Sequence, residues 1–391
     1  MASSENRLCS LDLLRGLDVF YLTALTPFVA WNLLPAWASA PEWVKAQFTH
    51  ALTMFTDGGD AVATQAGAMC VATTSSPSTT GFGLFDFAQP CFIFITGAAA
   101  ALSIPKRLDA EGRPTAAFWK HVLGRVALLW ALGCLIRGAL TFDLAHFSPY
   151  ADTLQTIAVA YLGGALSLLI RRKGVRLALP LVLLAAYGVI QATCGDYSRL
   201  GNVSRLVDER VFGAIGCKAK DFCYVLTTVA WASMGMLGAE IGRILKGTDT
   251  PWRKVRLLAG WGAVSLVLGW ILQIWIPANR FIYTVSFVFT TLGYAILLQD
   301  LLYVVTDIWR FRRGAGLFLL FGQCSLAAWM LYANPLSSGL AAIARNLVVG
   351  VPKLVGTNAY FNVYASFVQS VLLVVAVALW HRYKTARRAS K

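Results

Sequence analysis

The sequence is poor in charged residues, and this shortage limits the classes of protein to which it can belong. Charged side chains make up 14% of the 391 residues, hydrophobic ones make up 57%, and the mean hydropathy is +0.62. Several apolar runs approach the ~20 residues that a helix needs to cross a bilayer. Because open strands would leave backbone groups unpaired in lipid, we expect an all-α polytopic membrane protein rather than soluble domains.

Histidine is scarce too, with four residues in the chain. His121 falls on the predicted cytoplasmic side and His146 has no partner at metal-ligand spacing, so the sequence predicts no metal site. A Gly-x-x-x-x-Gly-Lys loop is also missing, which argues against a P-loop nucleotide site.

Acidic residues number 19 against 34 Lys and Arg, which gives a net charge of +15. The basic residues lie at alternate segment ends, a pattern typical of membrane topology, so we expect no nucleic-acid partner. Both termini are predicted to be cytoplasmic, in one domain covering 1–391. The ten predicted spans are 14–34, 84–103, 121–140, 153–170, 177–193, 222–243, 256–276, 281–303, 316–334 and 361–380.

A cleavable signal peptide is not expected. Ala38-Ser39-Ala40 resembles a cleavage site, but Asp18 interrupts the apolar run before it and Pro41 follows it. The first predicted span is therefore expected to be retained.

Three long connections lie on the predicted outer side. They are 35–83, 194–221 and 335–360, and the last contains Leu336–Val351, which is apolar enough for a re-entrant or interfacial helix. If that side is oxidising, its cysteines allow disulfides, and a Cys194–Cys217 pair is the favoured one.

Charged groups inside apolar spans are costly, so each is a candidate site residue. Asp18 follows Arg15 by three residues, which places both on one helical face. Two interpretations remain open: a structural ion pair near the cytoplasmic interface, or a cytoplasmic mouth shaped by Asp12, Arg15 and Asp18.

Arg125 lies one turn inside the third predicted span, after Lys120 and His121. It is either an interfacial arginine that extends to the headgroups, or part of a basic cluster that holds the phosphates of a cytoplasmic ligand.

His50 and Asp86 flank a segment rich in small residues on the predicted outer side. Asp86 is well placed to cap a helix, since it would face the positive end of the helix dipole. A carboxylate beside a histidine would also fix its tautomer and stabilise the imidazolium, so the pair is a candidate general base.

Several stretches in order resemble the heparan-α-glucosaminide N-acetyltransferase family of transmembrane acyltransferases and its bacterial relatives. Ser10-Leu-Asp-Leu-Leu-Arg-Gly-Leu-Asp18 resembles its opening Leu-Asp-x-x-Arg-Gly motif, and His50 with Asp86-Phe-Ala-Gln-Pro-Cys-Phe-Ile-Phe-Ile-Thr-Gly97 is similar to its His…Asp-Leu-x-x-Pro-x-Phe-x-Phe-x-x-Gly signature. The remaining matches are Arg125-Val-Ala-Leu-Leu-Trp, Leu154-Gln-Thr-Ile-Ala-Val-Ala-Tyr-Leu162 and Pro277-Ala-Asn-Arg-Phe-Ile-Tyr-Thr-Val-Ser-Phe287.

The resemblance implies transfer of acetyl from cytoplasmic acetyl-CoA to an amino sugar on the periplasmic side of a bacterial inner membrane. His50 would be the catalytic histidine, with Asp86 beside it. The amino sugar would be bordered by Asn279, Arg280, Thr284, Ser286 and Gln155. CoA would lie nearer Arg15, Asp18, Lys120 and Arg125.

The chain also departs from the family pattern. Residues 51–80 form an insert after His50, and no Trp follows that histidine as it does in the family. Thr156 stands where Arg is usual, Arg280 replaces Lys, Tyr283 replaces Trp, and Gln323 stands where Asn is common.

Two other functions are compatible with the sequence. One is a transporter of amino sugars or similar solutes without covalent chemistry, although no internal repeat is evident. The other is a structural protein that has kept the fold and lost the activity. The lipid bilayer is the expected partner in every case, and a homodimer is compatible with the sequence.

Overall fold

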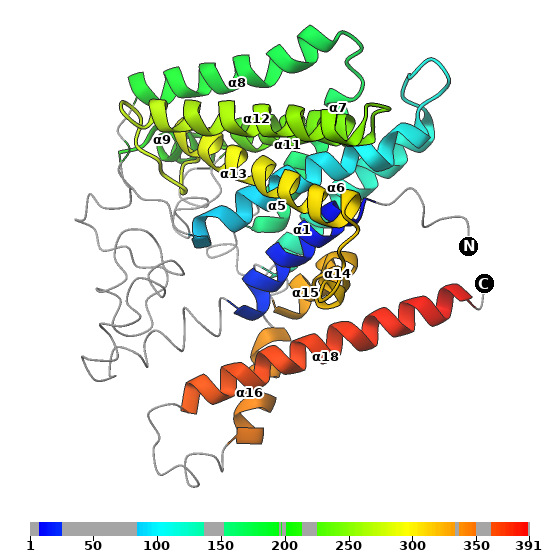
Figure 1. Ribbon diagram of the computed structural model, residues 1–391. Helices are drawn as coiled ribbons and strands as arrows, with labels where there is room; N and C mark the ends of the chain where they lie inside the picture. The colour runs from blue at the N-terminus through cyan, green and yellow to red at the C-terminus, as the bar shows by residue number, and fades with distance from the viewer. Residues whose placement is uncertain are drawn as a thin grey trace, which may run out of the picture. The chain divides into compact units, whose positions relative to one another are not determined.

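The computed structural model describes residues 8–25, 84–136, 152–194, 197, 201–212, 225–332, 336–348 and 361–389. Within these residues every regular element is a helix and no strand occurs, which confirms the all-α prediction (Figure 1). The chain forms two compact units. Gln89–Val304 make up the continuous unit, and Met1–Ala88 with Val305–Lys391 make up the discontinuous unit.

The continuous unit is built from long apolar helices and a few short connections. Its helix α5 (Leu84–Ser103) starts in the other unit and continues into the 3-10 helix η3 (Ile104–Arg107). The helices that follow are α6 (Ala116–Ile136), α7 (Thr153–Ser167), α8 (Lys173–Thr193), α9 (Val203–Phe212), α11 (Thr228–Lys246), α12 (Pro251–Leu272) and α13 (Val285–Tyr303).

Helix α11 packs against α5 and α7 with backbones almost in contact. A Cβ atom on Gly235 of α11 would meet the carbonyl group of Ala160 on α7, and one on Gly97 of α5 would meet that of Gly235. Small residues allow this close approach, which is how helices gain dispersion contacts where hydrophobic burial contributes little. These three helices form the centre of the continuous unit.

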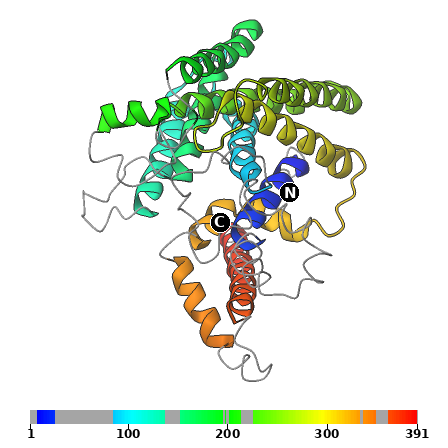
Figure 2. The same cartoon turned by 90° about the vertical axis from the view of Figure 1, so that its left-hand side faces the viewer.

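Helices α12 and α13 form a pair that lies side by side in Figures 1 and 2. Gly269 of α12 packs against Thr290 of α13, and Gly293 of α13 packs against Leu266. The opposite face of α12 exposes large apolar side chains such as Val264 and Trp270. Because water would not stabilise such a face, it is suited to contact with lipid.

The discontinuous unit brings the two ends of the sequence together. It contains α1 (Cys9–Phe20), the π-helix η1 (Tyr21–Leu25), α14 (Gly316–Gln323), α15 (Ser325–Tyr332), α16 (Leu336–Val348) and α18 (Phe361–Ala389). Helix α16 lies beside α18, as Figure 2 shows in orange and red. Most of Leu336–Val351, expected to form a re-entrant or interfacial helix, is therefore helical.

Helix α1 is held at its start by a residue far along the chain. Leu8 at the N-cap provides no side-chain hydrogen bond. Instead the Asp307 carboxylate, in the π-helix η5 (Val304–Ile308), accepts hydrogen bonds from the backbone N–H groups of Cys9 at 3.1 Å and Ser10 at 3.0 Å. A carboxylate there satisfies free N–H groups and faces the positive end of the dipole.

Among the residues that the structure describes, six helical segments are long and apolar enough to cross a membrane: 86–107, 116–136, 173–193, 251–272, 285–308 and 364–387. They correspond to six of the ten predicted spans. The described parts of the other four form shorter or more polar helices: α1, α7, α11, and α14 with α15. The count of ten and the cytoplasmic placement of both termini stay predictions.

Candidate functional site

A basic cluster of Arg107, His121 and Arg125 lies in the continuous unit, and its two arginines are next to Tyr161. The Arg125 guanidinium lies over the Tyr161 ring, with its carbon 4.7 Å from the ring centroid. Arg107 is close enough to act electrostatically on both Tyr161 and His121. No carboxylate forms an ion pair with Arg107 or Arg125 in the part of the chain that the structure describes.

The basic cluster is positioned by a tightly packed apolar layer. Tyr161 is 1% exposed and packs with Phe118 and Val122 of α6, Ile104 of η3 and Leu168. At the start of α6, the Thr115 hydroxyl donates to the Arg107 carbonyl at 2.7 Å and accepts from the Phe118 N–H. The turn before α6 therefore fixes the backbone of Arg107 relative to the helix that carries His121 and Arg125.

Lys120 does not join this cluster through any described contact. It is exposed, and five residues correspond to a rotation of about 140° around a helix, so Lys120 and Arg125 point from different faces of α6. His121 is four residues from Arg125 and shares its face. The predicted role of Lys120 and Arg125 in binding CoA stays a prediction.

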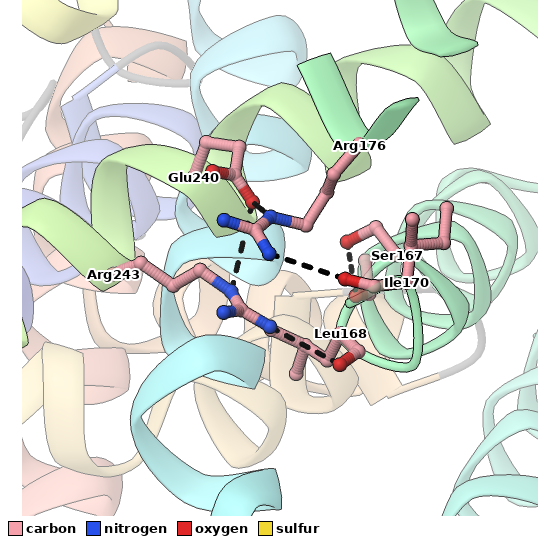
Figure 3. A network of polar contacts seen from close by, with 7 residues as sticks. Ser167, Leu168, Ile170, Arg176, Glu240 and Arg243 are labelled. Atoms are coloured by element: carbon pink, nitrogen blue, oxygen red, sulfur yellow. Dashed lines mark hydrogen bonds and ion pairs between the residues drawn. The ribbon is translucent and has the colours of Figure 1, made fainter. Parts of the chain in front are cut away.

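A second charged group lies where α8 and α11 meet. Figure 3 shows the Glu240 carboxylate beside the Arg176 guanidinium, and its Oε1 atom forms ion pairs with both Arg176 and Arg243. Arg176 donates to Glu240 through Nε and to the Ile170 carbonyl at 3.1 Å, and Arg243 donates to the Leu168 carbonyl at 3.1 Å. This group is a structural clamp, because its guanidinium groups hold the end of α7 against α8 and α11.

The opposite end of α7 carries a polar network that includes Gln155. The Asp152 side chain accepts from the Leu154 N–H at 2.9 Å, and the side-chain amide oxygen of Gln155 accepts from the Asp152 N–H at 3.0 Å. These bonds form a capping box, which stabilises the start of α7. The neighbouring Thr156, at the position where the family has Arg, accepts a hydrogen bond from Gln89 of α5.

The predicted amino-sugar residues around 279–286 build a compact loop. The Thr284 hydroxyl accepts from the Asn279 N–H and donates to the Pro277 carbonyl, both at 2.9 Å. The Asn279 amide oxygen accepts from the Phe281 N–H, and its nitrogen donates to the Tyr197 carbonyl at 3.2 Å. Both side chains are therefore engaged in holding the loop.

Two further predicted residues, Ser286 and Arg280, lie in or next to this loop. Ser286 is buried, with its hydroxyl 3.2 Å from that of Thr284, and the Arg280 guanidinium lies 4.6 Å from the centroid of the Phe281 ring. Tyr283 has a φ of 47°, which is strained for a bulky residue. Its buried ring packs edge-on against Trp231 and Phe287, which offsets that strain.

The two predicted catalytic residues differ in how far the structure describes them. Asp86 lies in the first turn of α5 and is 6% exposed. This position suits a carboxylate that caps the helix. It does not test the predicted role of Asp86 in orienting the His50 ring. His50 lies outside the described residues, so its pairing with Asp86 stays a prediction.

In the discontinuous unit, Arg15 forms its ion pair with Asp12 at 3.4 Å. Asp18 is 6% exposed, and its Oδ2 atom has no hydrogen-bond partner. The Arg15–Asp18 pair suggested by the spacing is therefore replaced by a pair one turn earlier. Both spacings are i, i+3, which is why the sequence alone did not distinguish them.

Sequence reasoning missed Arg107, Tyr161 and the Arg176–Glu240–Arg243 clamp. Glu240 falls inside the predicted span 222–243, so the rule that singled out Asp18 would also have found it. Arg107 was counted only as a topology signal. The position of Tyr161 facing Arg125 depends on how α6 and α7 pack, and no single-helix pattern encodes that.

The described cysteines and metal-ligating residues form neither a disulfide nor a metal site. Cys194 is a free, exposed thiol in the part of the chain that the structure describes. Cys217 lies outside the described residues, so the Cys194–Cys217 disulfide stays a prediction. No group of three or more His, Cys, Asp or Glu is arranged to hold a metal ion in the described ranges.

Comparison with known proteins adds no further assignment. A scan against protein-family models and a search of curated proteins both find no match for this chain, so its function has to be argued from the chemistry of these groups.

Proposed function

We propose that the chain is a transmembrane acetyltransferase of the heparan-α-glucosaminide N-acetyltransferase type. It takes acetyl from cytoplasmic acetyl-CoA and transfers it to the amine of an amino sugar on the periplasmic side. The observation that carries the proposal is the basic cluster of Arg107, His121 and Arg125, which has no carboxylate partner among the described residues.

An uncompensated pair of arginines in an apolar span favours an anionic ligand. In the clamp, by contrast, a carboxylate of the protein itself compensates the arginines, because Glu240 forms ion pairs with both Arg176 and Arg243. CoA carries several phosphates, and charge-assisted bonds from guanidinium to phosphate are among the strongest hydrogen bonds in proteins. Contact with the Tyr161 ring holds the Arg125 side chain in place before the ligand binds.

Acetyl transfer needs a positioned thioester, a base and a stabiliser for the oxyanion. In the proposed reaction the amine nitrogen attacks the thioester carbonyl carbon, and the CoA thiolate leaves as the tetrahedral intermediate collapses. His50 takes the ammonium proton and Asp86 orients its ring. An acetyl-histidine intermediate at His50 is the alternative chemistry at the same residue.

The decisive experiment uses purified protein in proteoliposomes with radiolabelled acetyl-CoA and a panel of amino sugars. We expect label on an acceptor, and we expect it to vanish with His50→Ala. Solute flux without acetylation would instead establish the transporter alternative. Acetylation that persists at the wild-type rate in His50→Ala would refute the proposed base.

The basic cluster is tested separately through the KM for acetyl-CoA. Arg125→Ala removes a charge-assisted contact, so we expect KM to rise about 10- to 100-fold while kcat changes little. The matched control is Arg256→Ala, which removes an exposed arginine of α12. Equal effects of the two substitutions would show that the basic cluster does not bind CoA.

A further inference from the structure

The Asp18 carboxyl lies in α1, and no described residue pairs with it. It is 6% exposed, its Oδ2 makes no hydrogen bond, and no ion pair involves it among the described residues. The nearest arginine in the sequence, Arg15, is paired with Asp12. Asp18 therefore differs from the other carboxylates of this unit that the structure describes in detail, since Asp307 accepts two backbone hydrogen bonds and Asp12 has its arginine.

The elements of the discontinuous unit that pack against α1 supply no cation. Helix α14 has the sequence Gly-Leu-Phe-Leu-Leu-Phe-Gly-Gln, and the only ionisable groups in η1 and α15 are the phenols of Tyr21 and Tyr332. Helix α18 contacts η1 through Ser370, and its basic residues start at His381, about 16 Å further along the helix. Arg312 lies at the other end of α1, near Cys9.

An ionised carboxylate would be strongly disfavoured in such a place, because neither water nor a countercharge replaces its hydration shell. A neutral carboxyl avoids most of that cost. We propose that Asp18 is a proton-binding site of the membrane-embedded part of the chain, holding its proton as long as α1 and α14 stay packed together. This inference does not depend on the acetyltransferase proposal.

The segment after Asp18 provides a way for the proton to leave. The chain passes from α1 directly into the π-helix η1, a form of helix that recurs at functional sites. Side chains satisfy carbonyl groups here: Thr23 donates to the Val19 carbonyl at 2.7 Å and Ser370 of α18 donates to the Ala24 carbonyl at 2.9 Å. Local opening of η1 alone would therefore expose Asp18 to water while α1 stays helical.

The test is chemical labelling with dicyclohexylcarbodiimide, an apolar reagent that reacts with protonated carboxyls. The carboxyl proton moves to a reagent nitrogen while the carboxylate oxygen bonds to the central carbon, and the adduct rearranges to a stable N-acylurea. We expect Asp18 to be modified at pH 7 in folded, detergent-solubilised protein, at least about tenfold faster than Asp12 or Asp307, because Arg15 and two backbone N–H groups hold the oxygens of those two carboxyls.

Peptide mass mapping reads the label residue by residue, which matters because Asp300 of α13 is also buried with an unpartnered oxygen. Absence of label on Asp18 in the folded protein, while protein denatured at about pH 4 is labelled there, would overturn the proposal, because an exposed Asp is partly protonated at that pH. So would protection of Asp18 by Na⁺ but not by choline, since a bound metal cation would then occupy the carboxylate.

A second measurement tests the protonation of Asp18 without the reagent, through the thermal stability of a variant. Asp18→Asn copies the neutral carboxyl in shape, so we expect its Tm at pH 7 to equal or exceed that of the wild type. A marked fall in Tm would show that the ionised form has a stabilising partner, which contradicts a proton site. Asp12→Asn is the control that removes a true ion pair of α1.

Discussion

At the scale of single residues, Glu240 is the charge on which the clamp depends. Its side chain and that of Arg176 are each 10% exposed, so their mutual attraction is little screened by solvent. Without the carboxylate, Arg176 and Arg243 would face each other at the end of α7 with no anion between them. Removing one partner of a buried ion pair destabilises a protein far more than replacing both partners with apolar residues, because it leaves a buried charge without a partner.

We therefore expect Glu240→Gln to lower the free energy of unfolding by about 3 kcal/mol, seen as a fall in Tm. The matched control is Glu209→Gln, which breaks the exposed pair with Arg205 and is expected to cost less than about 1 kcal/mol. If both variants have the same Tm, Glu240 is not a clamp.

Asp208 of α9, which lies outside the candidate spans, should make the stability of the protein depend on pH. Burial raises its pKa to about 6, and the hydrogen bond from the Val225 N–H only partly opposes this. Since the folded pKa exceeds the unfolded one, the stability it contributes is complete below about pH 4 and is lost as the pH rises through about 6. By pH 8 the loss amounts to about 3 kcal/mol at most.

Asp208→Asn stays neutral at every pH, so its Tm relative to the wild type should be higher at pH 8 than at pH 4.5. Differential scanning fluorimetry at the two pH values measures this difference. Asp249→Asn, which changes an exposed carboxylate, should shift the Tm little at either pH. A Tm difference for Asp208→Asn that is the same at both pH values would contradict the prediction.

At the scale of helices, glycine decides how closely α11 approaches its neighbours. Gly235→Ala would place a Cβ against the carbonyl of Ala160, and since backbone cannot move aside, α7 and α11 must separate. We expect a loss of about 1–3 kcal/mol, measured as a lower Tm or a smaller yield of folded protein. Gly260→Ala on α12 meets no atom and should be neutral or slightly stabilising, so equal losses would disprove the packing argument.

The helices were easier to predict than the contacts between them. Apolar length identified the six long segments, because a helix that faces lipid must be continuously apolar. Helix α11 is buried by other helices and carries Glu240, Arg243 and Lys246, so hydropathy describes it poorly. The structure divides 316–334 into α14 and α15 at Cys324. Because residue 324 is neither Pro nor Gly, the sequence predicted one continuous span there.

The sequence indicated which residues belong to the candidate sites, but not the contacts that they make. The family resemblance indicated the segment 277–287, but Asn279 and Thr284 satisfy backbone groups of this loop, which only its conformation reveals. Arg125 was found because charge is costly in lipid. Its neighbours Arg107 and Tyr161 come from η3 and α7, and tertiary packing brings them together.

At the scale of the whole molecule, membrane topology can be tested with thiols already in the chain. Cys194 is exposed after α8 and is predicted to lie on the outer side, whereas Cys9 is predicted to be cytoplasmic. A membrane-impermeant maleimide added to intact spheroplasts should label Cys194 and leave Cys9 unlabelled until the membrane is permeabilised. The reverse pattern would invert the predicted topology, and Cys194→Ser identifies the labelled peptide.

The bond between Asp307 and the start of α1 has a consequence for how the protein is made. The partners are 297 and 298 positions apart, so at about 5–20 residues per second the ribosome needs roughly 15–60 s to supply the second after the first. The continuous unit is completed within that interval. The first N–H groups of α1 thus have no carboxylate from Asp307 until the continuous unit has been synthesised, and the discontinuous unit closes only after that.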